Sequence, residues 1–302
     1  IDDFKTIVLA TDFSAASCGA LHYAKQLSRR VSAKLLLVHV IDSRIFPPSA
    51  AAESSGLSEA IDAAEDELQK LAAGLSNDFI RNTIIVRHGS VRETLLQLIS
   101  ERNADLLVIG TTGKGCKSGE TLGSVAELLL RAMPCPVLTV GKRVRQDALE
   151  ATHVRQVLFP TDFSEGSRAA VTYVEHLTQF LAGQVLLLHV DESETTPPLR
   201  GSRGERAGFE AIVSEMQRPS IVAESIMHAG RVAESIVTVA AEKRVDIIVL
   251  GVHGGEDRTR VQDREGGIAR DVVRLAKCPV FTICPIAHKE ALKSKLQAAT
   301  WD

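Results

Sequence analysis

The sequence contains few aromatic residues and no long apolar stretch. Phenylalanine, tyrosine and tryptophan make up 4% of the 302 residues, so we predict a core built from aliphatic side chains. No apolar run reaches the roughly 18 residues that a membrane-spanning helix requires. The first residues form no secretory apolar segment either. These absences argue against a membrane or secreted protein and favour a cytoplasmic location.

An excess of positive charge is also missing. The 35 lysine and arginine residues are outnumbered by 38 aspartate and glutamate residues, which gives a formal net charge of -3. Proteins that bind nucleic acids usually carry a basic surface. We therefore expect neither a nucleic acid nor a membrane as a partner.

Cysteine pairs with the spacing of a metal site are absent as well. The five cysteines form no Cys-x-x-Cys pair and their number is odd, which predicts neither a zinc site nor a disulfide framework. This usage fits a reducing cytoplasm. The cysteines are Cys18, Cys116, Cys135, Cys278 and Cys284.

What the sequence does contain is an internal duplication. Residues 7–14 (Ile-Val-Leu-Ala-Thr-Asp-Phe-Ser) return 150 positions later as 157–164 (Val-Leu-Phe-Pro-Thr-Asp-Phe-Ser). Further segments match in the same order, namely 35–40 with 185–190, 105–110 with 246–251, and 135–140 with 278–283. A repeat of this length indicates two tandem domains rather than a solenoid. We place the domains at 1–143 and 144–302.

Each half alternates short apolar runs with helical patterns. This order predicts an α/β fold in which each domain has an open, doubly wound, five-stranded parallel sheet of the Rossmann-like type. In the first half we expect strands at 6–10, 34–40, 80–87, 105–110 and 136–140. Helices are expected at 14–31, at 57–74 with an end at Gly74, at 90–102, and from the end of a glycine-rich loop to 132. A charged linker at 141–155 and a terminal helix at 287–302 complete the prediction.

The glycine-rich loop covers residues 110–124 and reads Gly-Thr-Thr-Gly-Lys-Gly-Cys-Lys-Ser-Gly-Glu-Thr-Leu-Gly-Ser. It leaves an apolar strand and ends where a helix begins, so free backbone N–H groups and the helix dipole favour an anion there. Gly110 and Gly113 permit a tight turn and close approach of the backbone. Ser124 can cap the helix or bond a phosphate oxygen. The loop fits neither the Walker nor the dinucleotide motif, because Cys116 stands where the Walker lysine is required.

The spacing of this loop is Gly, two residues, Gly, nine residues, then Gly-Ser, which resembles the ATP-binding signature of the universal stress protein family. The Thr-Asp-Phe-Ser segment, the second strand at 35–40 and the Gly-x-Val-x-Glu turn at 89–93 fall in the family's order. Each half therefore resembles one universal stress protein domain, and the resemblance covers nearly the whole chain. It implies an ATP-binding regulatory protein of the stress response.

The resemblance also implies the residues that hold ATP, with Mg2+, in the first domain. Asp12 would contact the nucleoside, the backbone of Val40 would contact adenine, and the loop backbone would hold the phosphates. Lys114 and Lys117 would add positive charge nearby. The full set is Ala10, Thr11, Asp12, Val40, Gly110, Thr112, Gly113, Lys114, Gly123, Ser124 and Val125.

Other interpretations of single residues stay open. Asp12 can instead serve the dipole of the helix that follows it, although we favour ligand contact. His39 and His189 lie within apolar strands, where a hydrogen-bonded core histidine is the more common case than a catalytic base. Asp105 and Asp246 begin strands and are expected to act as turn or capping residues. We assign no catalytic and no metal-binding residue.

The second domain departs from the motif. Eleven residues rather than nine separate Gly254 from Gly266, and glycine replaces the loop serine at Gly267. Its loop carries four acidic residues, which would repel a triphosphate, so we predict weakened or lost ATP binding here. Arg258, Arg260 or Arg264 could restore it by contacting phosphate directly. The corresponding second-site residues are Pro160, Asp162, Val190, Gly251, Gly254, Gly266 and Gly267.

Two other functions compete with a regulatory ATP-binding protein. One is a slow ATPase or phosphotransferase, and the other is a nucleotide-free scaffold that binds an unidentified protein partner. Domains of the resembling family commonly pair through their last strands. We therefore expect the two domains to pair through 136–140 and 279–283, and two chains to form a homodimer.

Overall fold

The computed structural model describes residues 4–45, 55–113, 122–144, 155–168, 170–181, 183–192, 203–217, 221–251 and 267–283. Several sequence predictions fall outside these ranges, namely those on Lys114, Cys116, Lys117, Gly254, Arg258, Arg260, Arg264, Gly266, Cys284 and the segment 287–302. The chain divides into two compact units between Lys142 and Arg143. Each unit is described by itself.

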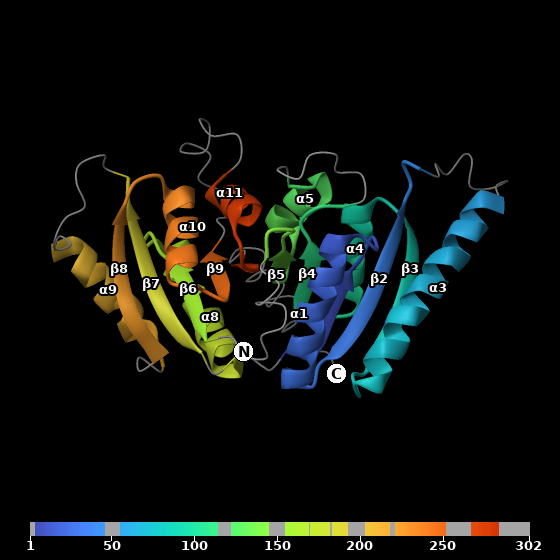
Figure 1. Cartoon of the computed structure of the whole chain (residues 1–302), viewed down its shortest axis with the longest axis horizontal. Helices are drawn as coiled ribbons and strands as arrows, with labels where there is room; N and C mark the ends of the chain where they lie inside the picture. Colours follow the sequence, from blue (N-terminus) through green and yellow to red (C-terminus); the bar gives the residue numbers. More distant parts are fainter. Residues whose placement is uncertain are drawn as a thin grey trace, which may run out of the picture. The chain divides into compact units, whose positions relative to one another are not determined.

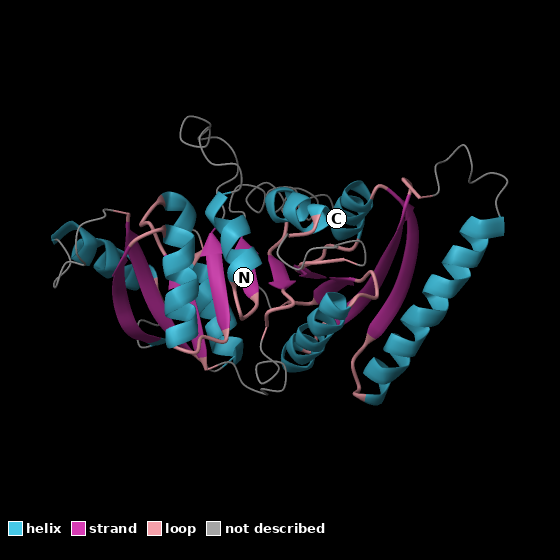
Figure 2. Ribbon diagram, turned by 45° about the horizontal axis from the view of Figure 1, so that its top comes forward, coloured by secondary structure: helices cyan, strands magenta, loops and turns pink. Residues whose placement is uncertain are grey.

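The first unit is built on a parallel sheet with the strand order β3-β2-β1-β4-β5 (Figure 1). Its strands are β1 (Thr6–Ala10), β2 (Lys34–Asp42), β3 (Asn82–Gly89), β4 (Leu106–Gly110) and β5 (Val137–Val140). Its helices are α1 (Ala15–Val31), α3 (Ser55–Asn77), α4 (Val91–Glu101) and α5 (Ser124–Ala132). Helix α1 packs over β1, β4 and β5 and α3 packs over β2 and β3, while α4 and α5 pack together. Helices thus cover both faces of the sheet (Figure 2).

The second unit repeats this arrangement with the strand order β8-β7-β6-β9-β10. Its strands are β6 (Gln156–Pro160), β7 (Gln184–Asp191), β8 (Val222–Ala229), β9 (Ile247–Gly251) and β10 (Val280–Ile283). Its helices are α7 (Glu165–Arg168), α8 (Val171–Leu181), α9 (Arg203–Glu215), α10 (Val232–Glu242) and α11 (Gly267–Leu275). The predicted α/β fold with two doubly wound parallel sheets is confirmed.

Apolar runs in the sequence became buried strands, as the pattern predicted. The middle residues of β1 and β4 are almost completely buried, and the corresponding residues of β6 and β9 behave in the same way. Burial on both faces explains why these strands are continuously apolar instead of alternating. The core they form is mainly aliphatic.

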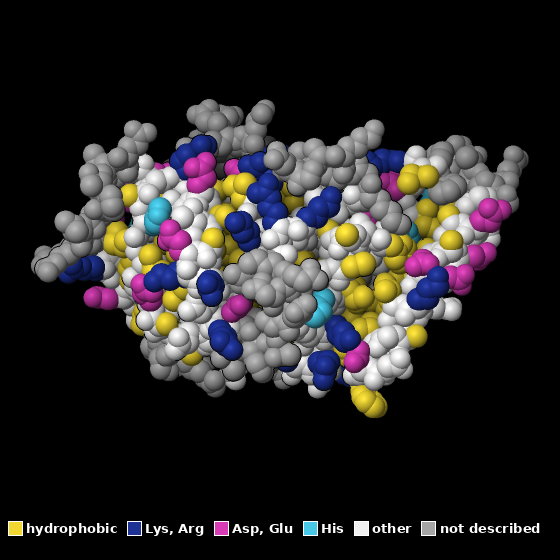
Figure 3. Space-filling model, viewed as in Figure 1, with side chains coloured by type: hydrophobic (Ala, Val, Ile, Leu, Met, Phe, Trp, Pro, Cys, Tyr) yellow, Lys and Arg dark blue, Asp and Glu magenta, His cyan; other side chains and the backbone are white. Residues whose placement is uncertain are grey.

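Helix α3 does not end at Gly74, so that prediction was wrong. The helix continues to Asn77, because Leu75 is buried just beyond the glycine and extends the packed face. Burial of this side chain outweighs the cost of about 1 kcal/mol for a helical glycine. The helix ends instead before Phe79, which adopts the left-handed conformation with φ 59°. Figure 3 shows Asp and Glu side chains along the outer face of α3.

Asp105 also differs from its predicted local role. Its Oδ2 accepts hydrogen bonds from the backbone N–H groups of Lys5 and Thr6, both at 2.9 Å. The carboxylate therefore fixes the start of β1 beside the start of β4, a hundred residues away. Asp246 does the same in the second unit, accepting from the N–H groups of Arg155 at 2.7 Å and Gln156 at 3.0 Å.

Candidate functional site

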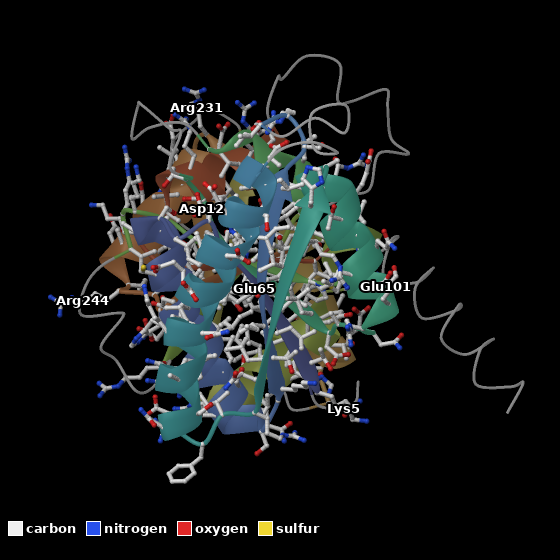
Figure 4. The ribbon with its side chains drawn as sticks, turned by 90° about the vertical axis from the view of Figure 1, so that its right-hand side faces the viewer. Lys5, Asp12, Glu65, Glu101, Arg231 and Arg244 are labelled. Carbon is white, nitrogen blue, oxygen red and sulfur yellow. The ribbon has the colours of Figure 1, made fainter. Side chains whose placement is uncertain are left out.

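The turn after β1 is closed by its own side chains. Thr11 continues the pairing of β1 with β2, since its N–H donates to the carbonyl of Val38 at 2.9 Å. The hydroxyl of Thr11 accepts from the N–H of Phe13 at 3.0 Å, and Asp12 Oδ1 accepts from the N–H of Ser14 at 3.1 Å. Phe13 takes a positive φ of 59°. These bonds hold the Asp12 carboxylate at the carboxyl edge of the sheet, near the upper end of the unit in Figure 4.

His39 supports this turn from the neighbouring strand. Its Nδ1 lies 2.8 Å from the carbonyl oxygen of Thr11, and its ring centroid lies 4.7 Å from that of Phe13. A carbonyl only accepts hydrogen bonds, so Nδ1 carries the proton. His39 is hydrogen-bonded as predicted, and it is half-buried rather than enclosed. Its contacts are those of a side chain that positions the turn.

The strand β4 and the loop after it approach this turn closely at two glycines. A Cβ built on Gly110 would lie 2.8 Å from the backbone of both Ala16 and Ser17 at the start of α1. A Cβ on Gly113 would lie 2.7 Å from Asp12 Oδ2. Contacts under 3.0 Å are not found for real Cβ atoms. The loop glycines and the Asp12 carboxylate therefore lie close together, at the edge that the carboxyl ends of these parallel strands share.

The end of the loop is also tightly closed. The N–H of Gly123 donates to the carbonyl of Thr111 at 2.8 Å, and a Cβ on Gly123 would come within 3.2 Å of that oxygen. Gly123 is the N-cap of α5, and the cap has no side-chain hydrogen bond. Ser124 is the first helical residue and is exposed, so it does not cap the helix. Phosphate contact, its other predicted role, stays a prediction.

A serine joins the turn after β1 to the loop after β4. Ser14 is the N-cap of α1, and its Oγ accepts from the N–H of Ser17 at 3.3 Å. The same hydroxyl donates to the carbonyl of Thr112 at 3.2 Å. Thr112 is buried, and its own hydroxyl has no partner within the described part of the chain. Ala10, Val40 and Val125 are half-buried around the same edge.

The second unit keeps the turn but changes its serine contact. Phe163 has φ 61°, and His189 Nδ1 lies 2.9 Å from the carbonyl of Thr161, as in the first unit. The Ser164 hydroxyl, however, donates to Asp162 Oδ1 at 2.6 Å, and the Ser164 N–H donates to the same oxygen at 3.0 Å. One carboxylate oxygen of Asp162 is thus bound twice within its own turn.

The glycine that ends β9 is packed as its counterpart in β4 is. A Cβ on Gly251 would lie 2.9 Å from the carbonyl oxygen of Gly166. Pro160 and Val190 are half-buried at the ends of their strands. Gly267 opens α11 with φ 61°, a conformation that suits glycine.

An acidic residue that the sequence argument did not single out lies at the end of β2. Asp42 accepts a side-chain hydrogen bond from Arg44 Nε at 2.8 Å, and this contact holds the pKa of Asp42 below its ordinary value. Asp42 is two positions beyond Val40, at the carboxyl edge of the sheet where Asp12 lies. An Asp-x-Arg sequence at the end of a strand was the signal that could have revealed it.

Neither a metal-ligand cluster nor a membrane-spanning helix is found among the described residues. They contain no group of three or more His, Cys, Asp or Glu side chains arranged to hold a metal ion. In the same part of the chain, no helix is long and apolar enough to cross a bilayer.

A carboxylate turn and a glycine loop at the carboxyl edge of a doubly wound sheet define a duplicated α/β protein of the Rossmann-like class. The sequence model of the universal stress protein family matches residues 3–141 and, a second time, residues 153–283. The chain belongs to the universal stress protein family.

The chain is similar to a shorter relative and to one of about its own length. It is 30% identical over 141 residues to the universal stress protein MJ0531 of Methanocaldococcus jannaschii, which covers 46% of this chain and 83% of that protein. A crystal structure of a universal stress protein from Archaeoglobus fulgidus superimposes with a TM-score of 0.72 at 20% identity, covering 93% of this chain and 96% of the other. This second likeness shows that the fold extends over nearly the whole chain.

Proposed function

We propose that the first unit binds ATP and that nucleotide binding makes the protein a regulatory component of the stress response. One observation carries the proposal. Gly113 of the glycine loop lies so close to Asp12 Oδ2 that a Cβ on it would come within 2.7 Å of that oxygen. A nucleoside-binding carboxylate and a phosphate-binding backbone would then face one ligand.

The charge of Asp12 decides which part of ATP it would meet. A carboxylate next to a triphosphate would be repelled, whereas ribose hydroxyls are good donors to it. We therefore assign the ribose to Asp12 and adenine to the backbone of Val40. The phosphates would be held by the loop backbone around Gly110, Gly113 and Gly123 and by the N–H groups of Ser124 and Val125, with Thr112 and Lys114 beside them. Mg2+ would neutralise phosphate charge when it accompanies ATP.

The start of helix α5 suits this assignment of the phosphates. The first N–H groups of a helix have no partner within the helix, and the helix dipole is positive at this end. The N-cap residue of α5, Gly123, forms no side-chain cap hydrogen bond with the first N–H groups of the helix. Gly123 lets the backbone approach closely at this point.

We further propose that the second unit binds ATP more weakly. Asp162 Oδ1 already accepts two hydrogen bonds from Ser164, which leaves less capacity for a ribose hydroxyl. The sequence of its glycine loop also carries more negative charge than the first loop. We treat 1–143 and 144–302 as the two domains, each built around one such site.

The test compares two glycine-to-alanine variants. In Gly113→Ala the new methyl group would collide with the Asp12 carboxylate, so ATP affinity measured by calorimetry should fall at least about tenfold. Gly74→Ala makes the same chemical change where no atom lies within 4 Å, and its ATP affinity should be unchanged. Melting temperatures of both variants show whether folding is retained.

Nucleotide content of the purified protein gives a second result. About one ATP per chain would support one working site and a weaker one. Two per chain would contradict the difference between the units. A chain that carries no nucleotide and binds none at millimolar ATP would replace this proposal with the scaffold function.

A further inference from the structure

Positively charged residues open three neighbouring strands of the first unit. Lys5 directly precedes β1, Lys34 is the first residue of β2, and Arg81 directly precedes β3. The N–H of Lys34 donates to the carbonyl of Lys5 at 2.8 Å, and the N–H of Leu35 donates to the carbonyl of Arg81 at 2.9 Å. Adjacent strands lie about 4.8 Å apart. The three exposed cations therefore form a row along the amino end of the sheet.

Helix α1 adds two more cations at the same place. Arg29 and Arg30 lie in its last turn, and its C-cap is Ser32, two residues before Lys34. Arg81 Nη2 donates to the carbonyl of Ser32 at 2.7 Å, which joins the helix end to the row. We call Lys5, Arg29, Arg30, Lys34 and Arg81 the basic end. Figure 3 shows Lys and Arg side chains over the lower ends of α1 and β2.

Two acidic residues near the basic end, within the part of the chain that the structure describes, form contacts of their own. Asp78 forms an ion pair with Lys25 of α1. Asp105 accepts two backbone N–H groups with its Oδ2. Arg29 and Lys34 form no ion pair with any described residue. Figure 4 places Lys5 and Asp12 at opposite ends of the unit, so the basic end is separate from the candidate nucleotide site.

An exposed aromatic ring stands beside these cations. Phe79, two residues before Arg81, is 96% exposed. It occupies the turn between α3 and β3 with φ 59°, where its N–H donates to the carbonyl of Ser76 at 3.0 Å. A left-handed conformation is unfavourable for phenylalanine, and glycine is the usual residue after a helix. Neither burial nor backbone geometry explains a phenylalanine here.

The second unit shows that the fold does not need the basic end. Strand pairing and helix-end hydrogen bonds match Lys34 with Gln184, Arg81 with Ile221, and Arg29 with Gln179. By the same offset, Arg30 corresponds to Phe180. Among the five cations of the basic end, only Lys5 has a basic counterpart, which is Arg155. The basic end is therefore a feature of the first unit that the second unit does not share.

We propose that the basic end and Phe79 bind an anionic lipid surface. Clusters of four to eight lysines and arginines attract anionic lipid headgroups, and an aromatic side chain adds apolar contact at the interface. The net charge of -3 for the whole chain conceals this local excess. A single ring offers no platform on which successive bases could stack, which makes a nucleic acid the poorer fit. The proposal is independent of ATP binding.

Co-sedimentation of the full chain with vesicles tests the proposal. One set of vesicles is pure phosphatidylcholine and the other contains 30% phosphatidylglycerol. The protein should sediment with the anionic vesicles in 0.1 M salt, and binding should fall several-fold in 0.5 M salt because salt screens the headgroups. Equal binding to both vesicles, or binding to neither, would overturn the proposal.

Matched variants locate the contact. Arg29→Gln with Lys34→Gln introduces the residues that the second unit carries at these positions, so folding should be retained while vesicle affinity falls at least about tenfold. Phe79→Gly should also reduce the affinity for anionic vesicles. The control pair, Arg92→Gln with Arg206→Gln, removes the same charge from exposed positions elsewhere. Unchanged binding in the first pair, equal loss in the control, or tighter binding to a 20-base-pair DNA duplex than to vesicles would each contradict the proposal.

Discussion

Asp12 and Gly113 are in contact although a hundred positions separate them in the sequence. A Cβ on Gly113 would lie 2.7 Å from Asp12 Oδ2, so the glycine permits the loop to pass directly over the carboxylate. The same carboxylate accepts the Ser14 N–H through its other oxygen. Its orientation is therefore fixed by the turn before any ligand binds. Pre-ordering of this kind reduces the entropic cost of binding.

The first prediction concerns what Asp12 recognises. Asp12→Asn keeps the size of the side chain and removes its charge. If the carboxylate accepts a ribose hydroxyl, ATP affinity should fall about tenfold, because a hydrogen bond to a charged group contributes about 1.5–3 kcal/mol. Inorganic triphosphate should bind at least as well as before, since a repelling charge is gone.

Asp162→Asn is the matched control for this experiment. It makes the same change in the second unit, and its effect on ATP affinity should be smaller. Calorimetry with both ligands measures the two affinities. Equal losses for ATP and triphosphate in Asp12→Asn would rule out a nucleoside contact.

A second prediction concerns a helical glycine that is held by packing. Gly208 lies within α9, where alanine would ordinarily stabilise the protein by about 0.4–1 kcal/mol. A Cβ at this position would lie 2.7 Å from the ring of Phe163, which is also packed edge-on against Phe209. Gly208→Ala should therefore lower the free energy of unfolding by about 1–3 kcal/mol.

Gly74→Ala provides the comparison, since it lies in α3 with open space around it. This variant should show the ordinary stabilisation of about 0.4–1 kcal/mol. Urea denaturation of both variants gives the two values. Stabilisation by Gly208→Ala would show that the ring of Phe163 moves aside easily.

A third prediction concerns the stability of the protein at acid pH. The hydrogen bond from Arg44 lowers the pKa of Asp42 in the folded state. The group then contributes stability that is complete above its unfolded pKa of about 3.9 and is lost as the pH falls through the folded pKa. Asp42→Asn should therefore lose less stability than the wild type on acidification below about pH 4. Urea denaturation at pH 7 and pH 3 measures this, and identical losses in both proteins would contradict it.

The sequence predicted the fold well because its signals are local. Buried parallel strands produce short apolar runs, and the duplication makes each run appear twice. The meeting of Asp12 with the glycine loop could also be expected, because the carboxyl ends of parallel strands share an edge. Asp105 was misjudged, since its bond to the N–H of Lys5 depends on which strands are neighbours. The end of α3 was missed because burial of Leu75 outweighed Gly74.

The basic end was missed for the same reason as the Asp105 contact. Lys5, Lys34 and Arg81 are scattered over the sequence and become neighbours only through strand order. Net charge averages over the whole chain, so it cannot show that one end of one unit is basic. Local composition predicts which elements form, whereas surfaces that span several elements require the register between them.

The last prediction links the stability of the protein to its surface. The φ of 59° at Phe79 costs conformational free energy. Because the ring is 96% exposed, its burial offsets little of this cost. Glycine adopts this conformation freely after a helix. Phe79→Gly should therefore raise the free energy of unfolding by about 1 kcal/mol, as measured by urea denaturation. Phe163→Gly is the matched control, because φ is 61° there but the ring packs on His189 with centroids 4.5 Å apart. That variant should be destabilised, and a Phe79→Gly protein less stable than the wild type would show that the exposed ring has a structural role.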